Sequence, residues 1–158
     1  MAQPLRLPPE EPVSELLWFA GGEVDETSVC LRVFGDDLVP SELSDLLGVQ
    51  PTKSWRKGDV FQGKKYDRIQ KTGSWHLSTE RQADVSLEAQ INQLLDQITP
   101  DLTIWAQLIG QYDVDLFCGL WLLRWNREIA FSPQTLLRIA ERVLLLDLDI
   151  YFKLDEDA

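Results

Sequence analysis

The chain has 158 residues, of which 44% are hydrophobic and 26% charged, and its formal net charge is −11. This length and apolar content are typical of one globular domain and exclude a disordered chain. A strongly acidic protein repels the phosphates of nucleic acid, so we expect no nucleic-acid partner. No apolar run approaches the roughly 20 residues of a membrane helix, so we expect no membrane partner either.

The start of the chain differs in composition from the rest. Residues 1–14 are rich in proline and acidic, which predicts an extended tail. They lack the apolar core of a signal peptide, which favours a cytoplasmic location. Residues 15–158 are expected to form a single α+β domain.

The first half of the chain predicts two strands and one helix. Residues 27–34 alternate between apolar and polar side chains, as a half-buried strand does. A short helix is expected after Pro40, with Gly48 in the left-handed position that ends it. From 49 to 72 no period persists, which predicts a long irregular connection. Alternation resumes over residues 74–80, which predicts the second strand.

The second half predicts three helices and two strands. Apolar residues at three- and four-residue steps indicate one helix over 87–98 and a second from Pro100 to Gly110. Residues 112–124 alternate over a long strand. The pair Ser132 and Pro133 is typical of a helix start, and residues 146–154 alternate to the end.

These elements predict the fold class. Every strand has a polar side, which favours one sheet with helices on one face. We therefore expect an α+β protein with a four-stranded, mostly antiparallel or mixed sheet, as a ferredoxin-like or related two-layer sandwich. The two cysteines, Cys30 and Cys118, fall on opposite sides of their strands, which predicts opposite sheet faces and no disulfide.

Several segments together resemble a known family. They are RVFGDDLVP at 32–40, LLGVQPT at 46–52, WRKG at 55–58, KTGSW at 71–75 and LDLDIYF at 146–152. In this order and spacing they resemble the bacterial domain of unknown function 4279 family, over about residues 27–152. The resemblance implies an uncharacterised bacterial protein and supplies no catalytic residues. The acidic, proline-rich start lies outside the pattern.

The connection over residues 52–75 is the first candidate site. It carries seven of the fifteen Lys and Arg residues, interleaved with aromatic residues. As an anion clamp, Arg56 would grip a carboxylate or phosphate, Lys53 and Lys57 would add charge, and Trp55 or Trp75 would supply a stacking face. In the alternative, both tryptophans are core anchors and the cations pair with nearby aspartates.

The polar side of the sheet is the second candidate. Its strand positions combine aromatic rings with the carboxylates of Asp113, Asp115, Asp147 and Asp149. So many rings call for cover by the connection itself, a second subunit, or a ligand or protein partner. The interface candidates are Phe34, Phe117 and Trp121, and the ligand candidates here are Asp147, Asp149 and Tyr151.

No catalytic constellation stands out in the sequence. His76 is the only histidine, which argues against paired-imidazole metal sites and serine triads. We therefore expect no catalytic residue, metal or cofactor, and a non-enzymatic binding or interaction module, as in toxin neutralisation or immunity, that is a monomer or a homodimer. The alternative is a small-ligand or metal-dependent enzyme, with a site between the basic-aromatic connection and the Asp147 and Asp149 strand; Mg²⁺ or Ca²⁺ would suit such oxygen ligands.

Overall fold

The computed structural model describes residues 21–152, and the expected tail at 1–14 lies outside this range. The fold is built on a five-stranded sheet in the order β2-β5-β1-β6-β7. Its strands are β1 (Glu26–Gly35), β2 (Lys53–Trp55), β5 (Gly73–Ser78), β6 (Asp113–Leu122) and β7 (Leu145–Phe152). The strands pair antiparallel except β6 and β7, which run parallel.

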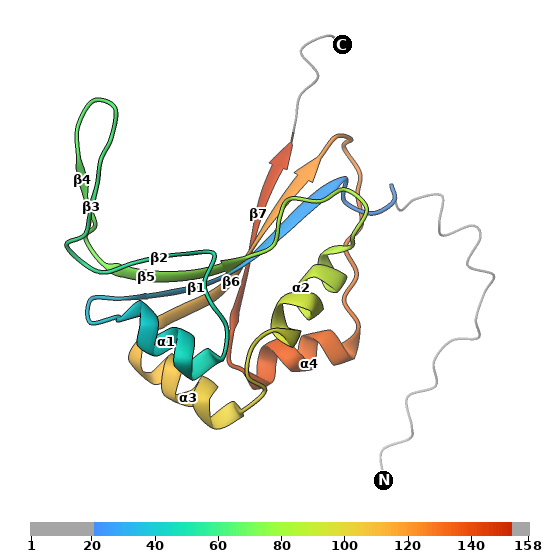
Figure 1. Ribbon diagram of the computed structural model, residues 1–158. Helices are drawn as coiled ribbons and strands as arrows, with labels where there is room; N and C mark the ends of the chain where they lie inside the picture. Colours follow the sequence, from blue (N-terminus) through green and yellow to red (C-terminus); the bar gives the residue numbers. More distant parts are fainter. Residues whose placement is uncertain (1–20, 153–158) are drawn as a thin grey trace.

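Four helices lie together on one side of this sheet (Figure 1). They are α1 (Pro40–Leu47), α2 (Leu87–Asp96), α3 (Leu102–Gln111) and α4 (Pro133–Glu141). The mixed α+β class and the one-sided helical layer are as the strand patterns predicted. None of the helices within residues 21–152 is long and apolar enough to cross a membrane.

Local sequence explains where the helices begin and end. The side chains of Ser86, Asp101 and Ser132 accept hydrogen bonds from backbone N–H groups in the first turns of α2, α3 and α4. Gly48 ends α1 at φ 75°, in the left-handed region that glycine enters without strain. α3 begins at Leu102, two residues after the expected start at Pro100, because Asp101 is its N-cap.

The core lies between the sheet and the helices. It is formed by alternate residues of the central strands, including Leu31 and Val33 of β1 and Leu116 and Leu120 of β6, packed against helix side chains such as Trp105. Cys118 belongs to this buried face, whereas Cys30 lies on the other one, and both thiols are free. The cysteine prediction is therefore confirmed.

The sheet differs from the expected plan in size and in topology. The sheet has a fifth strand, β2, because three residues of the supposedly irregular connection pair with β5. The same connection also contains β3 (Val60–Phe61) and β4 (Arg68–Ile69), which form a separate hairpin. In a split βαβ plan another strand lies between the two strands of each unit, but here β1 and β5 are neighbours, as are β6 and β7. The ferredoxin-like order is therefore not the one found.

Candidate functional site

The side of the sheet opposite the helices is named the open face. It carries Lys53 and Trp55 of β2, Ser74 and His76 of β5, Cys30, Arg32 and Phe34 of β1, Asp115, Phe117 and Trp121 of β6, and Asp147, Asp149 and Tyr151 of β7. Strand parity predicted this composition for β1, β5, β6 and β7, whereas Lys53 and Trp55 belong to β2, which was not expected as a strand. Since none of the four helices lies on this side (Figure 1), its side chains contact one another or solvent.

An arginine occupies the centre of the open face. The Arg32 guanidinium donates to both carboxylate oxygens of Asp115, with Nε 2.8 Å from Oδ1 and Nη2 2.5 Å from Oδ2. The distance from the same Nη2 to Oδ2 of Asp147 is 3.8 Å. The guanidinium carbon is also 4.1 Å from the ring centre of Phe117 and 5.6 Å from that of Phe34. Arg32 therefore makes two charge-assisted hydrogen bonds to one carboxylate and covers two rings.

A second arginine covers the tryptophan of β6. The Arg81 guanidinium carbon is 4.0 Å from the ring centre of Trp121, and its Nε donates to Glu26. Trp121 in turn stacks on Tyr151, with ring centres 5.3 Å apart and an interplanar angle of 10°. A side chain at Gly119 would collide with the Trp121 ring, at 2.6 Å from its Cη2. The absence of a side chain at Gly119 therefore allows the Trp121 ring to pack against the surface of the sheet.

The histidine of the open face sits among rings and cations. His76 makes edge-on contacts with Phe34 and Trp55, at ring-centre distances of 5.4 and 5.3 Å. Its Nε2 is 2.6 Å from Ser74 Oγ. Burial lowers the pKa of His76, and the charges of Arg32 and Lys53 lower it further. These surroundings favour the neutral form of the His76 imidazole, which is hydrogen-bonded to the Ser74 hydroxyl.

These contacts change how the rings of the open face are interpreted. Phe34, Phe117 and Trp121 are each only partly exposed, because Arg32, Arg81 and His76 contact them. The cover that their number called for is thus supplied largely by the chain itself. Their role as an interface stays a prediction. Other exposed apolar side chains lie on the β3–β4 hairpin, at Leu123 and Trp125 after β6, and around β7.

The β3–β4 hairpin, residues 60–69, stands out from the β2 edge of the sheet (Figure 1). It is named the cationic hairpin. Four of its apolar or aromatic side chains are exposed: Val60, Phe61, Tyr66 and Ile69. Gly63 permits the sharp return of the chain, because a side chain there would meet the Tyr66 carbonyl oxygen. Trp55 anchors the base of the hairpin by an edge-on contact with Phe61, at 5.9 Å between ring centres.

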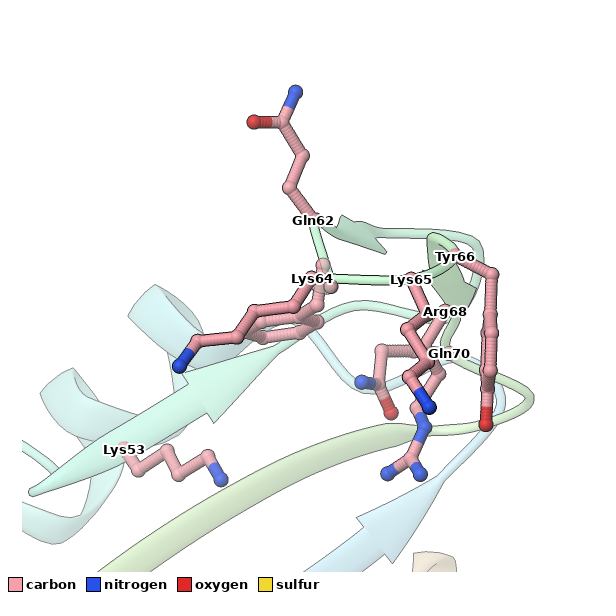
Figure 2. Close-up of a pocket in the computed structure, with 9 residues that line it drawn as sticks. Lys53, Gln62, Lys64, Lys65, Tyr66, Arg68 and Gln70 are labelled. Carbon is pink, nitrogen blue, oxygen red and sulfur yellow. The ribbon is translucent and has the colours of Figure 1, made fainter.

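A hollow of about 520 Å³ lies along the cationic hairpin. It is lined by Lys53, Phe61, Gln62, Gly63, Lys64, Lys65, Tyr66, Arg68 and Gln70. Figure 2 shows the side chains of Lys65, Tyr66 and Arg68 running in the same direction from the hairpin, whereas Gln62 points away from them. The lining thus holds four cations and two rings but no carboxylate, in a chain of net charge −11.

The cations of this hollow have no carboxylate partner in the described part of the chain. Among residues 21–152, the side chains of Lys64, Lys65 and Arg68 make no ion pair, and the contact of Lys53 is with the Trp55 ring, at 5.0 Å. Charges that are not paired within a chain are available to a ligand. This hollow, rather than the preceding Arg56–Lys57 dipeptide, is where the basic residues of the connection converge.

The other candidates from the connection have different surroundings. Trp75 is fully buried on the helical side of the sheet, where its indole N–H donates to Ser44 Oγ at 3.0 Å. It is a core anchor, so its ring cannot offer a stacking face. Trp55 is partly buried and donates to the Thr72 carbonyl oxygen. Lys57 forms a solvent-exposed ion pair with Asp36 at 2.5 Å. The Arg56 side chain is also exposed.

The two halves of the composite site suggested by the sequence lie far apart. The segment with Trp55, Arg56 and Lys57 is at the β2 edge, whereas Asp147, Asp149 and Tyr151 are on β7 at the opposite edge. Four strand spacings separate β2 from β7, which amounts to about 19 Å. A small ligand therefore cannot contact both groups. Within residues 21–152, no group of three or more His, Cys, Asp or Glu side chains could hold a metal ion.

The sequence interpretation included Lys64, Lys65, Tyr66 and Arg68 in the basic connection but did not assign them to the candidate site. The available signal was a hairpin pattern, in which Gly63 and polar neighbours separate two short β-prone pairs, Val60–Phe61 and Arg68–Ile69. Arg81 was also missed, because it follows its strand and reaches back over Trp121. No periodicity marks such a contact.

The chain was compared with known proteins. The model of the family described as "Domain of unknown function (DUF4279)" matches residues 25–153. No curated protein and no solved structure matches the chain. The match covers most of the chain and confirms the resemblance drawn from the sequence segments. The protein belongs to this family, DUF4279.

Proposed function

We propose that the protein is a non-enzymatic interaction module whose recognition element is the cationic hairpin. The observation that carries this proposal is the hollow lined by Lys53, Lys64, Lys65 and Arg68 without a carboxylate. These exposed cations make no ion pair within residues 21–152, and they create a local positive potential on a strongly acidic chain. An anionic group is the matching ligand.

The rings of the hairpin indicate what kind of partner carries that anion. Phe61 and Tyr66 line the same hollow as the cations, and Val60 and Ile69 add exposed apolar surface next to it. This mixture suits a protein segment in which carboxylates alternate with apolar or aromatic side chains. Duplex nucleic acid is a poor partner, because the rest of the chain would repel its phosphates.

A binding role fits the chemistry of the remaining surface. The central cation of the open face, Arg32, binds Asp115 through two hydrogen bonds. A guanidinium stays protonated at all ordinary pH values, so it is no proton donor or acceptor for a substrate. An acidic module of this kind would also suit the neutralisation of a basic toxin, which would have to bind away from the hairpin.

The proposal can be tested by titrating the full chain with a fluorescently labelled peptide that alternates Glu with Phe or Tyr. We expect Lys64→Glu/Lys65→Glu to weaken binding by about tenfold or more. The matched control is Arg56→Glu/Lys57→Glu, which makes the same charge change in the same connection but outside the hollow. At physiological salt the Debye length is about 8 Å, so this control should bind nearly as the parent does.

Three results would contradict the proposal. The first is equal weakening by both double variants, which would mean nonspecific attraction. The second is no binding of the peptide at any accessible concentration. The third is turnover of a phosphorylated or carboxylated substrate that is lost in Lys64→Glu/Lys65→Glu, which would make the hollow an enzyme site. Inorganic phosphate, titrated in parallel, distinguishes a protein segment from a small anion.

A further inference from the structure

The outer edge of β7 is the second place where exposed apolar side chains gather. Within residues 21–152, β7 is the last strand of the sheet and pairs only with β6, so no described segment pairs with its other edge along Leu145–Phe152. Eight residues of strand span about 26 Å. A straight, unpaired edge of this length is a template for another strand unless something blocks it.

The two sides of β7 differ sharply in chemistry. On the helical side, Leu148, Ile150 and Phe152 are 36%, 59% and 50% exposed, because the helices cover the central strands and leave this edge uncovered. On the open face, the same strand presents Asp147 and Asp149. The edge therefore offers apolar contacts on one side and carboxylates on the other.

Exposed apolar side chains also occur on α4 and in the turn that follows it. Leu136 and Leu137 of α4 are 47% and 62% exposed, and Val143 is 66% exposed. Leu145 is 64% exposed but lies on the open-face side of β7, at the register position of Asp115. Single exposed apolar residues need no explanation, but three on one side of an unpaired strand edge mark an interaction site.

A second copy of the chain is a poor occupant of this edge. When two β7 strands pair antiparallel about a twofold axis, residues of the same face oppose one another. In the registers that use most of the strand, Asp149 would face its own copy or Asp147 would face Asp149. Like charges in directly opposite positions destabilise a strand pair. The two aspartates thus act against self-association.

We infer that the outer edge of β7 accepts an extended basic segment of a partner protein as a sixth strand. The segment alternates Lys or Arg with Val, Ile or Leu, so that its cations oppose Asp147 and Asp149 and its apolar residues oppose Leu148 and Ile150. Main-chain hydrogen bonds supply affinity in this mode of recognition, and alternate side chains supply specificity. The net charge of −11 draws such a segment in.

This inference is independent of the hairpin hollow. The two surfaces lie at opposite edges of the sheet and attract opposite charges. A partner of the kind inferred here would still bind a chain whose hairpin cations had been reversed. The variant Lys64→Glu/Lys65→Glu therefore serves as a control that separates the two proposals.

The test uses the full chain and a capped heptapeptide that alternates Lys and Val. Hydrogen exchange of individual amides is followed by NMR with and without the peptide. We expect alternate amides of β7, those on the outer edge, to exchange at least about tenfold more slowly when the peptide is bound. A peptide of the same composition with its lysines in one block keeps the charge but loses the pattern, so it should give no such protection.

A charge exchange tests the pairing with the aspartates. Asp149→Lys should lower the affinity for the Lys/Val peptide by about fivefold or more. It should raise the affinity for the corresponding Glu/Val peptide. The matched control is Asp45→Lys, an exposed aspartate of α1, which should leave both affinities unchanged. Asp149→Asn provides an intermediate case if the lysine variant does not fold.

Four outcomes would overturn the inference. In the first, the blocked peptide binds as well as the alternating one. In the second, the alternating peptide binds without slowing the β7 amides. In the third, the outer amides are already protected in the chain alone, which would mean that a segment of the chain occupies the edge. In the fourth, the native mass is that of a dimer, and Asp149→Lys changes it.

Discussion

The carboxylate of Asp115 accepts two hydrogen bonds from the Arg32 guanidinium at directly opposite positions of β6 and β1. The pair is the hub of the open face, because Arg32 also covers Phe117 and approaches Asp147. The side chain of Arg32 is 25% exposed and that of Asp115 is 16% exposed. The pair is thus intermediate between a surface ion pair and a buried one, and this position decides how strongly it should stabilise the fold.

Asp115→Asn removes the charge and keeps the shape. We expect it to lower the free energy of unfolding by about 1–2 kcal/mol, the lower part of the range for bonds to charged groups, because solvent reaches the pair. Urea denaturation measures the change. The matched control is Asp36→Asn, which breaks the exposed pair with Lys57 and should leave stability unaltered. Equal effects of the two variants would refute the central role given to Arg32 and Asp115.

The single histidine offers a direct report on the open face. We expect the pKa of His76 to lie below 6.5, because burial and the charges of Arg32 and Lys53 disfavour the imidazolium. A lowered pKa means that stability is present above pH 6.5 and falls as the pH drops through the folded-state value. NMR titration of its ring protons measures the pKa. Arg32→Gln should raise it, and an unchanged or lower value would contradict the arrangement described.

Asp25 makes the start of the described chain sensitive to acid. Its carboxylate accepts from Arg127 Nη2 at 2.6 Å and from the Leu123 backbone N–H at 2.7 Å. These bonds lower its pKa from 3.8 to about 2, the hydrogen bond from Arg127 being the largest cause. The resulting stability is present above the unfolded value of 3.8 and is lost as the pH falls toward 2.

The Asp25 prediction is measured with Asp25→Asn. The variant should be less stable than the parent above about pH 5, and the two unfolding curves should converge as the pH approaches the folded-state pKa of about 2. A stability difference that is constant over this range would show that the effect of the substitution does not come from ionisation.

The two tryptophans of the basic connection should differ in their contribution to stability. Trp75→Ala should lower the free energy of unfolding by about 3–5 kcal/mol, since the ring is fully buried and bonded to Ser44. Trp55→Ala should cost only about 1–2 kcal/mol, because that ring is partly exposed. Thermal unfolding of both variants measures the difference. A larger loss for Trp55 would place the main anchor on the open face instead.

Regular alternation made most of the fold predictable from the sequence. The faces of β1, β5, β6 and β7 followed from the two-residue period, so the composition of the open face was correct in advance. The same period placed Trp75 beside Leu77 on the apolar side. Its choice as a ligand residue gave more importance to its basic neighbours than to its strand parity, and its burial shows that parity was the better guide.

Sheet order and very short strands could not be predicted in the same way. The strands β2, β3 and β4 have three, two and two residues, which is too few to show a period. The pattern within a strand also says nothing about its neighbours. For this reason the composite site joined Arg56 to Asp149, although the sheet separates the β2 edge from β7.

The strand order also has an electrical consequence. Unpaired cations collect at the β2 edge, while β6 and β7 carry aspartates and no Lys or Arg within Asp113–Leu122 and Leu145–Phe152. The sheet therefore carries a dipole moment directed across its strands. Any charged body that approaches will rotate the molecule before contact, so encounters are oriented and their rate falls as ionic strength rises.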